Sequence, residues 1–133
     1  KAGSILIPIL EKSEREHNDS LSASTLLCLA NLSKAQKNYS VALQRAFEAA
    51  RLHERLQNWR ELSAAYSAVA SVYLITEKDT ALFFLQKALK IAEEHSLSEA
   101  QGVALNNLGV YFHNKGDLDQ AIEYYKKSLE IDL

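Results

Sequence analysis

The chain has 133 residues, of which 47 % are hydrophobic and 24 % charged, with a formal net charge of −2. This length is sufficient for one domain with its own core, and the composition is ordinary for a globular protein. The near-balanced charge argues against a nucleic-acid surface, which requires clustered Lys and Arg, and the single Pro and four Gly favour long helices over a turn-rich all-β fold.

Nothing in the sequence indicates a membrane or an oxidising compartment. No apolar run approaches the ~18 residues of a membrane span. The opening stretch SILIPIL is short and is followed by no signal-peptide cleavage site. The single cysteine, Cys28, cannot form an internal disulfide, which favours a cytoplasmic protein. Because the chain starts at Lys1 and contains no Met, we expect it to be a piece of a longer protein.

The first predicted element is a helix in residues 1–17, which ends in the charged run EKSEREHND. Pro8 leaves two alternatives for this helix, because a proline inside a helix costs about 3 kcal/mol. The helix either begins at Pro8 or is kinked there. A shift of about 40 residues aligns this segment with a later helix, so residues 1–17 are predicted to be the second half of an earlier unit.

Three longer units follow, each predicted to be a pair of helices: residues 20–57, 59–95 and 97–133. They are anchored by Ala42, Ala81 and Ala121, which stand 39 and 40 residues apart. A regular period in this range is typical of helical repeat proteins. We attribute the shorter spacing to one residue fewer in the turn of the second unit.

Each unit repeats the same apolar pattern at steps of three and four residues, which places the pattern on one face of each helix. Small residues in the first helices allow close approach of the two helices; these are Ala30, Ala70 and Gly109. The second helices are predicted to begin at the N-caps Asn38, Asp79 and Asp117. Gly116 is expected to end the first helix of the last unit, and Ser96 or Ser98 to form a capping box at its start.

The stretch LNNLGVYFHNKGDLDQAIEYYKKSL in the third unit resembles the tetratricopeptide repeat (TPR). Six residues match the pattern of that family, with Ser128 in place of its usual Ala: Leu105, Leu108, Gly109, Phe112, Ala121 and Tyr125. The resemblance implies an all-α fold, a right-handed α-solenoid of antiparallel helix pairs. Units of about 40 residues are similar to those of LGN-like scaffolds and of Rap-like and MalT-like bacterial regulators. Solenoid ends normally carry a polar capping helix, so we expect both ends either to continue a longer array or to be covered by a partner, for which self-association through the uncapped ends is one possibility.

Signals for catalysis and for bound metals or cofactors are weak. His53-Glu54 begins like the zinc motif HExxH, but Gln57 stands where the second His is required. The remaining histidines have no paired ligand spacing. Cys28 has no nucleophile motif around it and is interpreted as a packed or groove-lining thiol. The sequence therefore predicts a protein that is not an enzyme and that has no cofactor or metal.

The resemblance implies that the first helices line a concave groove that binds a peptide. Carried over to this sequence, the groove residues are Asn31, Lys34, Ser67, Ser71, Val103, Asn106, Asn107, Val110, His113 and Asn114. Asn amides donate and accept hydrogen bonds at once and so suit a peptide backbone. We therefore expect a non-catalytic protein-interaction scaffold with a protein or peptide partner and no nucleic-acid or membrane partner. The alternative is a ligand-sensing regulatory module of a larger signalling or transcription-regulating protein.

Overall fold

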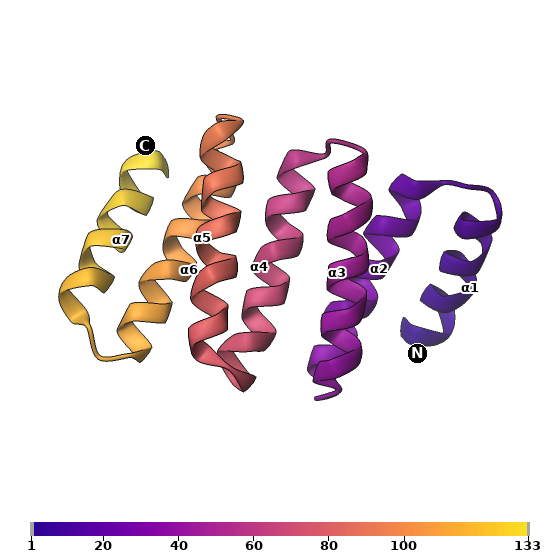
Figure 1. The fold of residues 1–133 in the computed structure, drawn as a ribbon, viewed down its shortest axis with the longest axis horizontal. Helices are drawn as coiled ribbons and strands as arrows, with labels where there is room; N and C mark the ends of the chain where they lie inside the picture. Colours follow the sequence, from indigo (N-terminus) through magenta and orange to yellow (C-terminus); the bar gives the residue numbers. More distant parts are fainter. Residues whose placement is uncertain (1, 133) are drawn as a thin grey trace.

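The computed structural model describes residues 2–132, which form seven α-helices and no β-strand (Figure 1). The predicted all-α fold is confirmed. Lys1 and Leu133, the outermost residues of the predicted first and last units, lie outside the described range. In chain order the helices are α1 (Ala2–Arg15), α2 (Asp19–Ala35), α3 (Tyr39–Arg55), α4 (Trp59–Thr76), α5 (Lys78–Glu94), α6 (Ser98–Asn114) and α7 (Leu118–Asp132).

The helices form antiparallel pairs that stack side by side into an α-solenoid, as predicted (Figure 1). The most extensive contacts lie within the pairs α2/α3, α4/α5 and α6/α7. Helix α4 also lies close to α2 and α6, whereas the backbones of α3, α5 and α7 do not approach one another closely within residues 2–132. The first helices of the pairs therefore lie on the tighter, concave side, and the second helices fan apart on the convex side.

Five of the six connections between these helices are three residues long and use the same turn. One residue of each turn has a positive φ, and the amide of the next residue donates to the carbonyl five positions earlier. Because α2 and α3 have 17 residues each, a helix and its turn together make a half-repeat of 20 residues. The residues with positive φ are His17, Lys37, Gln57, Ser96 and Gly116.

The connection between α4 and α5 is the exception, because it consists of Glu77 alone. The Glu77 amide donates to the Tyr73 carbonyl at 2.6 Å, and α5 begins at the next residue. This turn is two residues shorter than the others, and α4 with its 18 residues is one residue longer than α3, so the spacing between Ala42 and Ala81 is one residue below 40. The turn of the second unit is shorter, as predicted, but by two residues and not by the one expected.

Buried alanines and aromatic rings hold the pairs together. Ala42, Ala81 and Ala121 are all buried, as expected of small residues where helices approach closely. The central aromatic residue is Phe84 on α5, whose ring centroid lies 5.5 Å from that of Phe47 and 5.6 Å from that of Tyr73. Such aromatic pairs contribute roughly 0.5–1.5 kcal/mol beyond the area that they bury. This cluster joins α3, α4 and α5 across the boundary between two pairs.

The predicted caps hold in part. The φ of Gly116 is +86°, and the Asp117 carboxylate accepts from the Gln120 amide at 3.2 Å, as predicted. Asn38 stands at the N-cap of α3 but makes no side-chain capping bond. The predicted cap at Asp79 is wrong, because the one-residue turn makes Glu77 the N-cap of α5.

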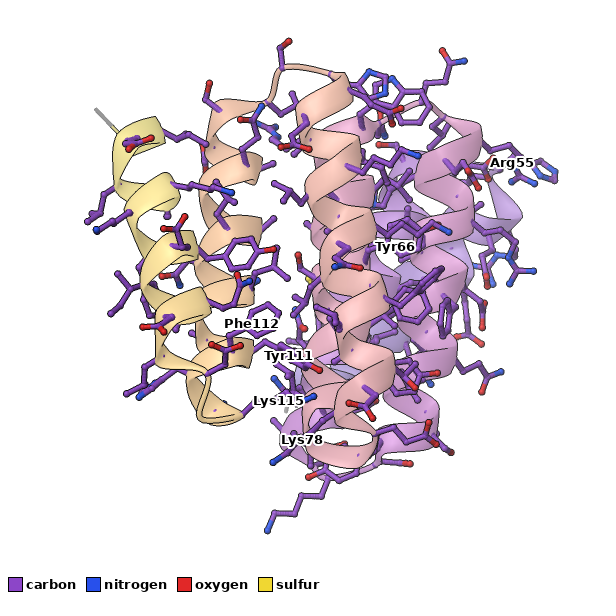
Figure 2. The ribbon with its side chains drawn as sticks, turned by 60° about the vertical axis from the view of Figure 1, so that its left-hand side comes forward. Arg55, Tyr66, Lys78, Tyr111, Phe112 and Lys115 are labelled. Atoms are coloured by element: carbon purple, nitrogen blue, oxygen red, sulfur yellow. The ribbon has the colours of Figure 1, made fainter. Side chains whose placement is uncertain are left out.

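Asp79 instead lies within the first turn of α5 and faces α6. Its Oδ1 atom accepts from the Tyr111 hydroxyl at 3.5 Å and from Lys115 Nζ at 3.4 Å. Figure 2 shows Tyr111 and Lys115 near the start of α5, where Lys78 is labelled. The side chain that was expected to cap a helix therefore links two neighbouring helix pairs.

Two further expectations at helix starts are wrong. The capping box expected before α6 is absent from the described structure, because the N-cap is Leu97 and Ser96 has a positive φ. The alternative in which the first helix begins at Pro8 is also wrong, because Pro8 lies inside α1.

Within residues 2–132, no helix combines the length and apolar character needed to cross a bilayer.

Candidate functional site

His53 is a core residue in this structure. It is 1 % exposed on α3, and its Nδ1 atom has no hydrogen-bond partner in the described range. Burial lowers the pKa of His53, and the Glu61 carboxylate opposes this shift. Within residues 2–132, no group of three or more His, Cys, Asp or Glu is arranged to hold a metal ion. Cys28 is exposed on α2 and free.

All ten residues predicted for the groove lie on the first helices, on the concave side of the solenoid. Asn31 and Lys34 are on α2, Ser67 and Ser71 are on α4, and the remaining residues are on α6. Their exposure differs. The exposed residues are Asn31, Val103, Asn106, His113 and Asn114, and the half-buried ones are Lys34, Ser67, Ser71, Asn107 and Val110.

Ser67 of α4 and Val103 of α6 line the same hollow between the two helices. It measures ≈ 120 Å³ and is here called the inner hollow. Its α4 side consists of the small residues Ser63, Ala64 and Ser67 together with Arg60, and its α6 side includes Glu99. The hollow exists because small side chains on α4 leave the space beside Val103 unfilled.

A second and larger hollow lies between α6 and α7, here called the end hollow. It measures ≈ 570 Å³ and is lined by Val103 and Asn106 from α6 and by Tyr125 and Leu129 from α7. Val103 therefore borders both hollows, and it is 52 % exposed despite its aliphatic side chain. An exposed aliphatic residue between two hollows is the arrangement expected of an anchor point for a ligand.

The structure does not bring all the predicted groove residues together. Seven of them border neither hollow: Asn31, Lys34, Ser71, Asn107, Val110, His113 and Asn114. The Ser71 hydroxyl is engaged within its own helix, because it donates to the Ala68 carbonyl at 2.7 Å. The side-chain amides of Asn31, Asn106 and Asn107 take part in no hydrogen bond of the described structure. These amides thus remain available to a ligand.

Residues one or two turns earlier on the same helices were missing from the predicted set. Arg60 and Glu99 come from opposite sides of the inner hollow, and each begins the stripe that leads to Ser67 or Val103. The spacing of three and four residues along α4 would have identified Arg60 as part of the same face. Arg60 contacts Glu61 at 3.5 Å in an exposed pair, an arrangement that is worth little and is easily exchanged for a ligand.

Comparisons with known proteins agree with this architecture. The sequence profile of the tetratricopeptide repeat family matches residues 102–132. No curated protein sequence matches the chain significantly. The crystal structure of BtubC (BKLC) from P. vanneervenii is similar with a TM-score of 0.83 and 25 % identity, over 96 % of this chain and 54 % of that one. This chain thus spans about half the length of BtubC.

The apo form of RapI is also similar in its crystal structure. The TM-score is 0.68 at 18 % identity, over 96 % of this chain and 59 % of RapI. This likeness concerns the fold. Taken together, α6 and α7 carry a tetratricopeptide repeat over residues 102–132, and the chain as a whole has the fold of TPR-like helical repeat proteins.

Proposed function

We propose that this chain is a non-catalytic protein-interaction module that binds a peptide segment of a partner in the concave groove formed by α2, α4 and α6. Its repeat type and fold are those of protein-interaction or regulatory helical repeat domains. The observation that carries the proposal is the position of Val103, which is exposed between two hollows and lies on the same helix as uncommitted amides.

The groove would recognise its ligand through one apolar contact and several backbone hydrogen bonds. An aliphatic side chain of the ligand would enter the inner hollow beside Val103, whose small volume admits a single side chain. The Asn106 and Asn107 amides would pair with ligand backbone groups, because an amide donates and accepts at once. Central apolar anchors carry most of the binding energy in such interfaces, so Val103 should be the most sensitive position.

The experiment is an affinity capture from host lysate with matched baits. One bait carries Val103→Glu, and the control carries Leu118→Glu, which changes an exposed aliphatic residue of similar exposure on α7. Circular dichroism first establishes equal helicity. We expect a partner that is held by the native chain and by the control but lost by Val103→Glu, and weakened by Asn106→Ala/Asn107→Ala.

The captured partner then identifies the ligand segment through overlapping peptides titrated against the purified chain. A peptide that binds the native chain and not Val103→Glu would support the concave groove. Partners that Val103→Glu retains in full, or that both glutamate variants lose equally, would overturn the proposal.

A further inference from the structure

A second groove lies on the opposite, convex side of the molecule. Because α3 and α5 fan apart, they leave a space of ≈ 550 Å³ over one end of α4, here called the convex wedge. Figure 1 shows α4 between α3 and α5, with the α3–α4 and α5–α6 connections at the same end of the molecule. This volume lies within the roughly 300–1,000 Å³ that is usual for ligand sites.

The wedge has an apolar floor and one exposed aromatic wall. Leu62 and Tyr66 of α4 form the floor and are buried within the pair, and Figure 2 shows Tyr66 beside α5. Phe83 of α5 forms the wall and is 59 % exposed, with its ring edge-on to Phe84 at 5.0 Å. A large aromatic side chain that is exposed to solvent beside an apolar floor offers a contact surface for an apolar group of a ligand.

Charge is unevenly distributed along the wedge. Lys87 Nζ lies 4.7 Å from the centroid of the Tyr66 ring and 5.8 Å from that of Phe83. Lys90 follows three residues later on the same helix, and neither lysine belongs to an ion pair of the described residues. Glu54 and Glu94 lie at the other end, near the stack of Trp59 on His95 at 4.3 Å. The half of the wedge at Tyr66 and Phe83 therefore carries Lys87, and the half at Trp59 and His95 carries the two glutamates, with Lys90 between the two halves on α5.

We infer that the convex wedge is a second binding site, which takes an acidic segment of a protein partner with an aromatic anchor residue. The anchor ring would lie against the exposed ring of Phe83, and neighbouring carboxylates would pair with Lys90 and with Lys87, which lies over the buried Tyr66 ring. A charge-assisted hydrogen bond to an ammonium is roughly twice as strong as a neutral one. The two glutamates disfavour a polyphosphate backbone, which needs an unbroken basic surface. This site is independent of the concave groove and would stand if that groove bound nothing.

Trp59 makes the proposal directly measurable, because it is the only tryptophan of the chain and it borders the wedge. The probe is a blocked peptide with a central phenylalanine flanked by glutamates. We expect a saturable change in Trp59 emission with this peptide. Matched peptides with alanine in place of phenylalanine, or lysines in place of glutamates, should bind at least about tenfold more weakly, since each removes a contact worth 1.4 kcal/mol or more.

Two charge-reversed variants separate the wedge from general electrostatics. Lys87→Glu should weaken the acidic peptide about tenfold. Lys127→Glu is the control: it stands one repeat later on α7, over the Tyr124 ring at 5.4 Å, and should leave binding unchanged. The inference is overturned if both variants weaken binding equally or if the lysine-flanked peptide binds as well. It is also overturned if oligothymidylate binds more tightly than the acidic peptide, or if emission stays constant up to about 1 mM peptide.

Discussion

Gly109 on α6 lies directly against the ring of Tyr125 on α7. A Cβ atom at position 109 would stand 2.7 Å from Tyr125 Cε1, closer than two such carbons can approach. The two earlier pairs place larger residues at the equivalent position of the first helix and smaller ones on the second. These are Ala30 against Ala46, and Ala70 in one core cluster with Leu85. Along the three repeats, the side chain on the second helix thus becomes larger, and in the last repeat the residue on the first helix becomes smaller. We call this change the size exchange.

This exchange predicts that the effect of Gly109→Ala on stability changes sign when Tyr125 is replaced by a smaller residue. In the native chain, Gly109→Ala should destabilise the fold by about 1 kcal/mol, because displacing the ring costs roughly 1–3 kcal/mol and exceeds the ~1 kcal/mol gained in helix propensity. With Tyr125→Leu in place, the same substitution should stabilise the chain. Urea unfolding of the four proteins measures both steps. Equal effects of Gly109→Ala in the two backgrounds would refute the size exchange.

The turns provide a second prediction. Gln57 has a φ of 59°, a conformation that is strained for every residue with a Cβ atom. Gln57→Gly should therefore raise the free energy of unfolding by about 0.5–1 kcal/mol. The control is Gln44→Gly. Because Gln44 is exposed in the middle of α3, this substitution should lower the free energy of unfolding by a similar amount. Destabilisation by both substitutions would show that the Gln57 turn is not strained.

Much of the fold could be predicted because residues that make equivalent contacts recur in each repeat of the sequence. Ala42, Ala81 and Ala121 recur at spacings of 39 and 40 residues and are all buried, so their spacing alone located the second helices. The cap at Asp79 could not be placed, because shortening a turn by two residues moves the helix start without changing the apolar pattern. Of the five left-handed turn residues, Gly116 was predicted to end a helix, and the other four were missed because they are not glycine.

The candidate sites were less predictable than the fold. Helical periodicity identifies the face on which Val103 and Asn106 lie, but not the hollows beside them, which depend on how closely neighbouring helices pack. The convex wedge depends on the separation of α3 and α5. This separation is set by how the helix pairs stack, so the sequence of a single helix does not predict it. Whether the ten groove residues bind a peptide remains a prediction that the capture experiment addresses.

A third prediction concerns the contact between α1 and α2. Ser13 Oγ donates to the Leu10 carbonyl at 2.9 Å, so its bond to Ser22 Oγ at 2.8 Å must use the Ser22 proton. Both side chains are buried. Ser13→Ala should cost about 1–2 kcal/mol because it leaves the Ser22 hydroxyl without its acceptor. Ser13→Ala/Ser22→Ala should cost less than the sum of the two single changes, as measured by urea unfolding, and strict additivity would argue against this pairing.

The last prediction is a pH dependence from His53. Burial lowers its pKa in the folded chain below the usual 6.5, although Glu61 opposes the shift. Below pH 6.5 the unfolded chain therefore binds a proton that the folded chain does not. The stability contribution is complete above pH 6.5 and falls as the pH decreases toward the lowered pKa, by at most about 1.4 kcal/mol per pH unit.

Urea unfolding between pH 7.5 and 5.5 tests this slope above the range in which carboxylates titrate. His53→Leu removes the titrating group and the buried Nδ1 atom that lacks a partner, so its stability should vary less with pH than that of the native chain. His113→Gln is the control, because His113 is exposed on α6 and its replacement should leave the native slope intact. If the slope instead disappears in His113→Gln and persists in His53→Leu, the proton uptake belongs to the groove and not to the core.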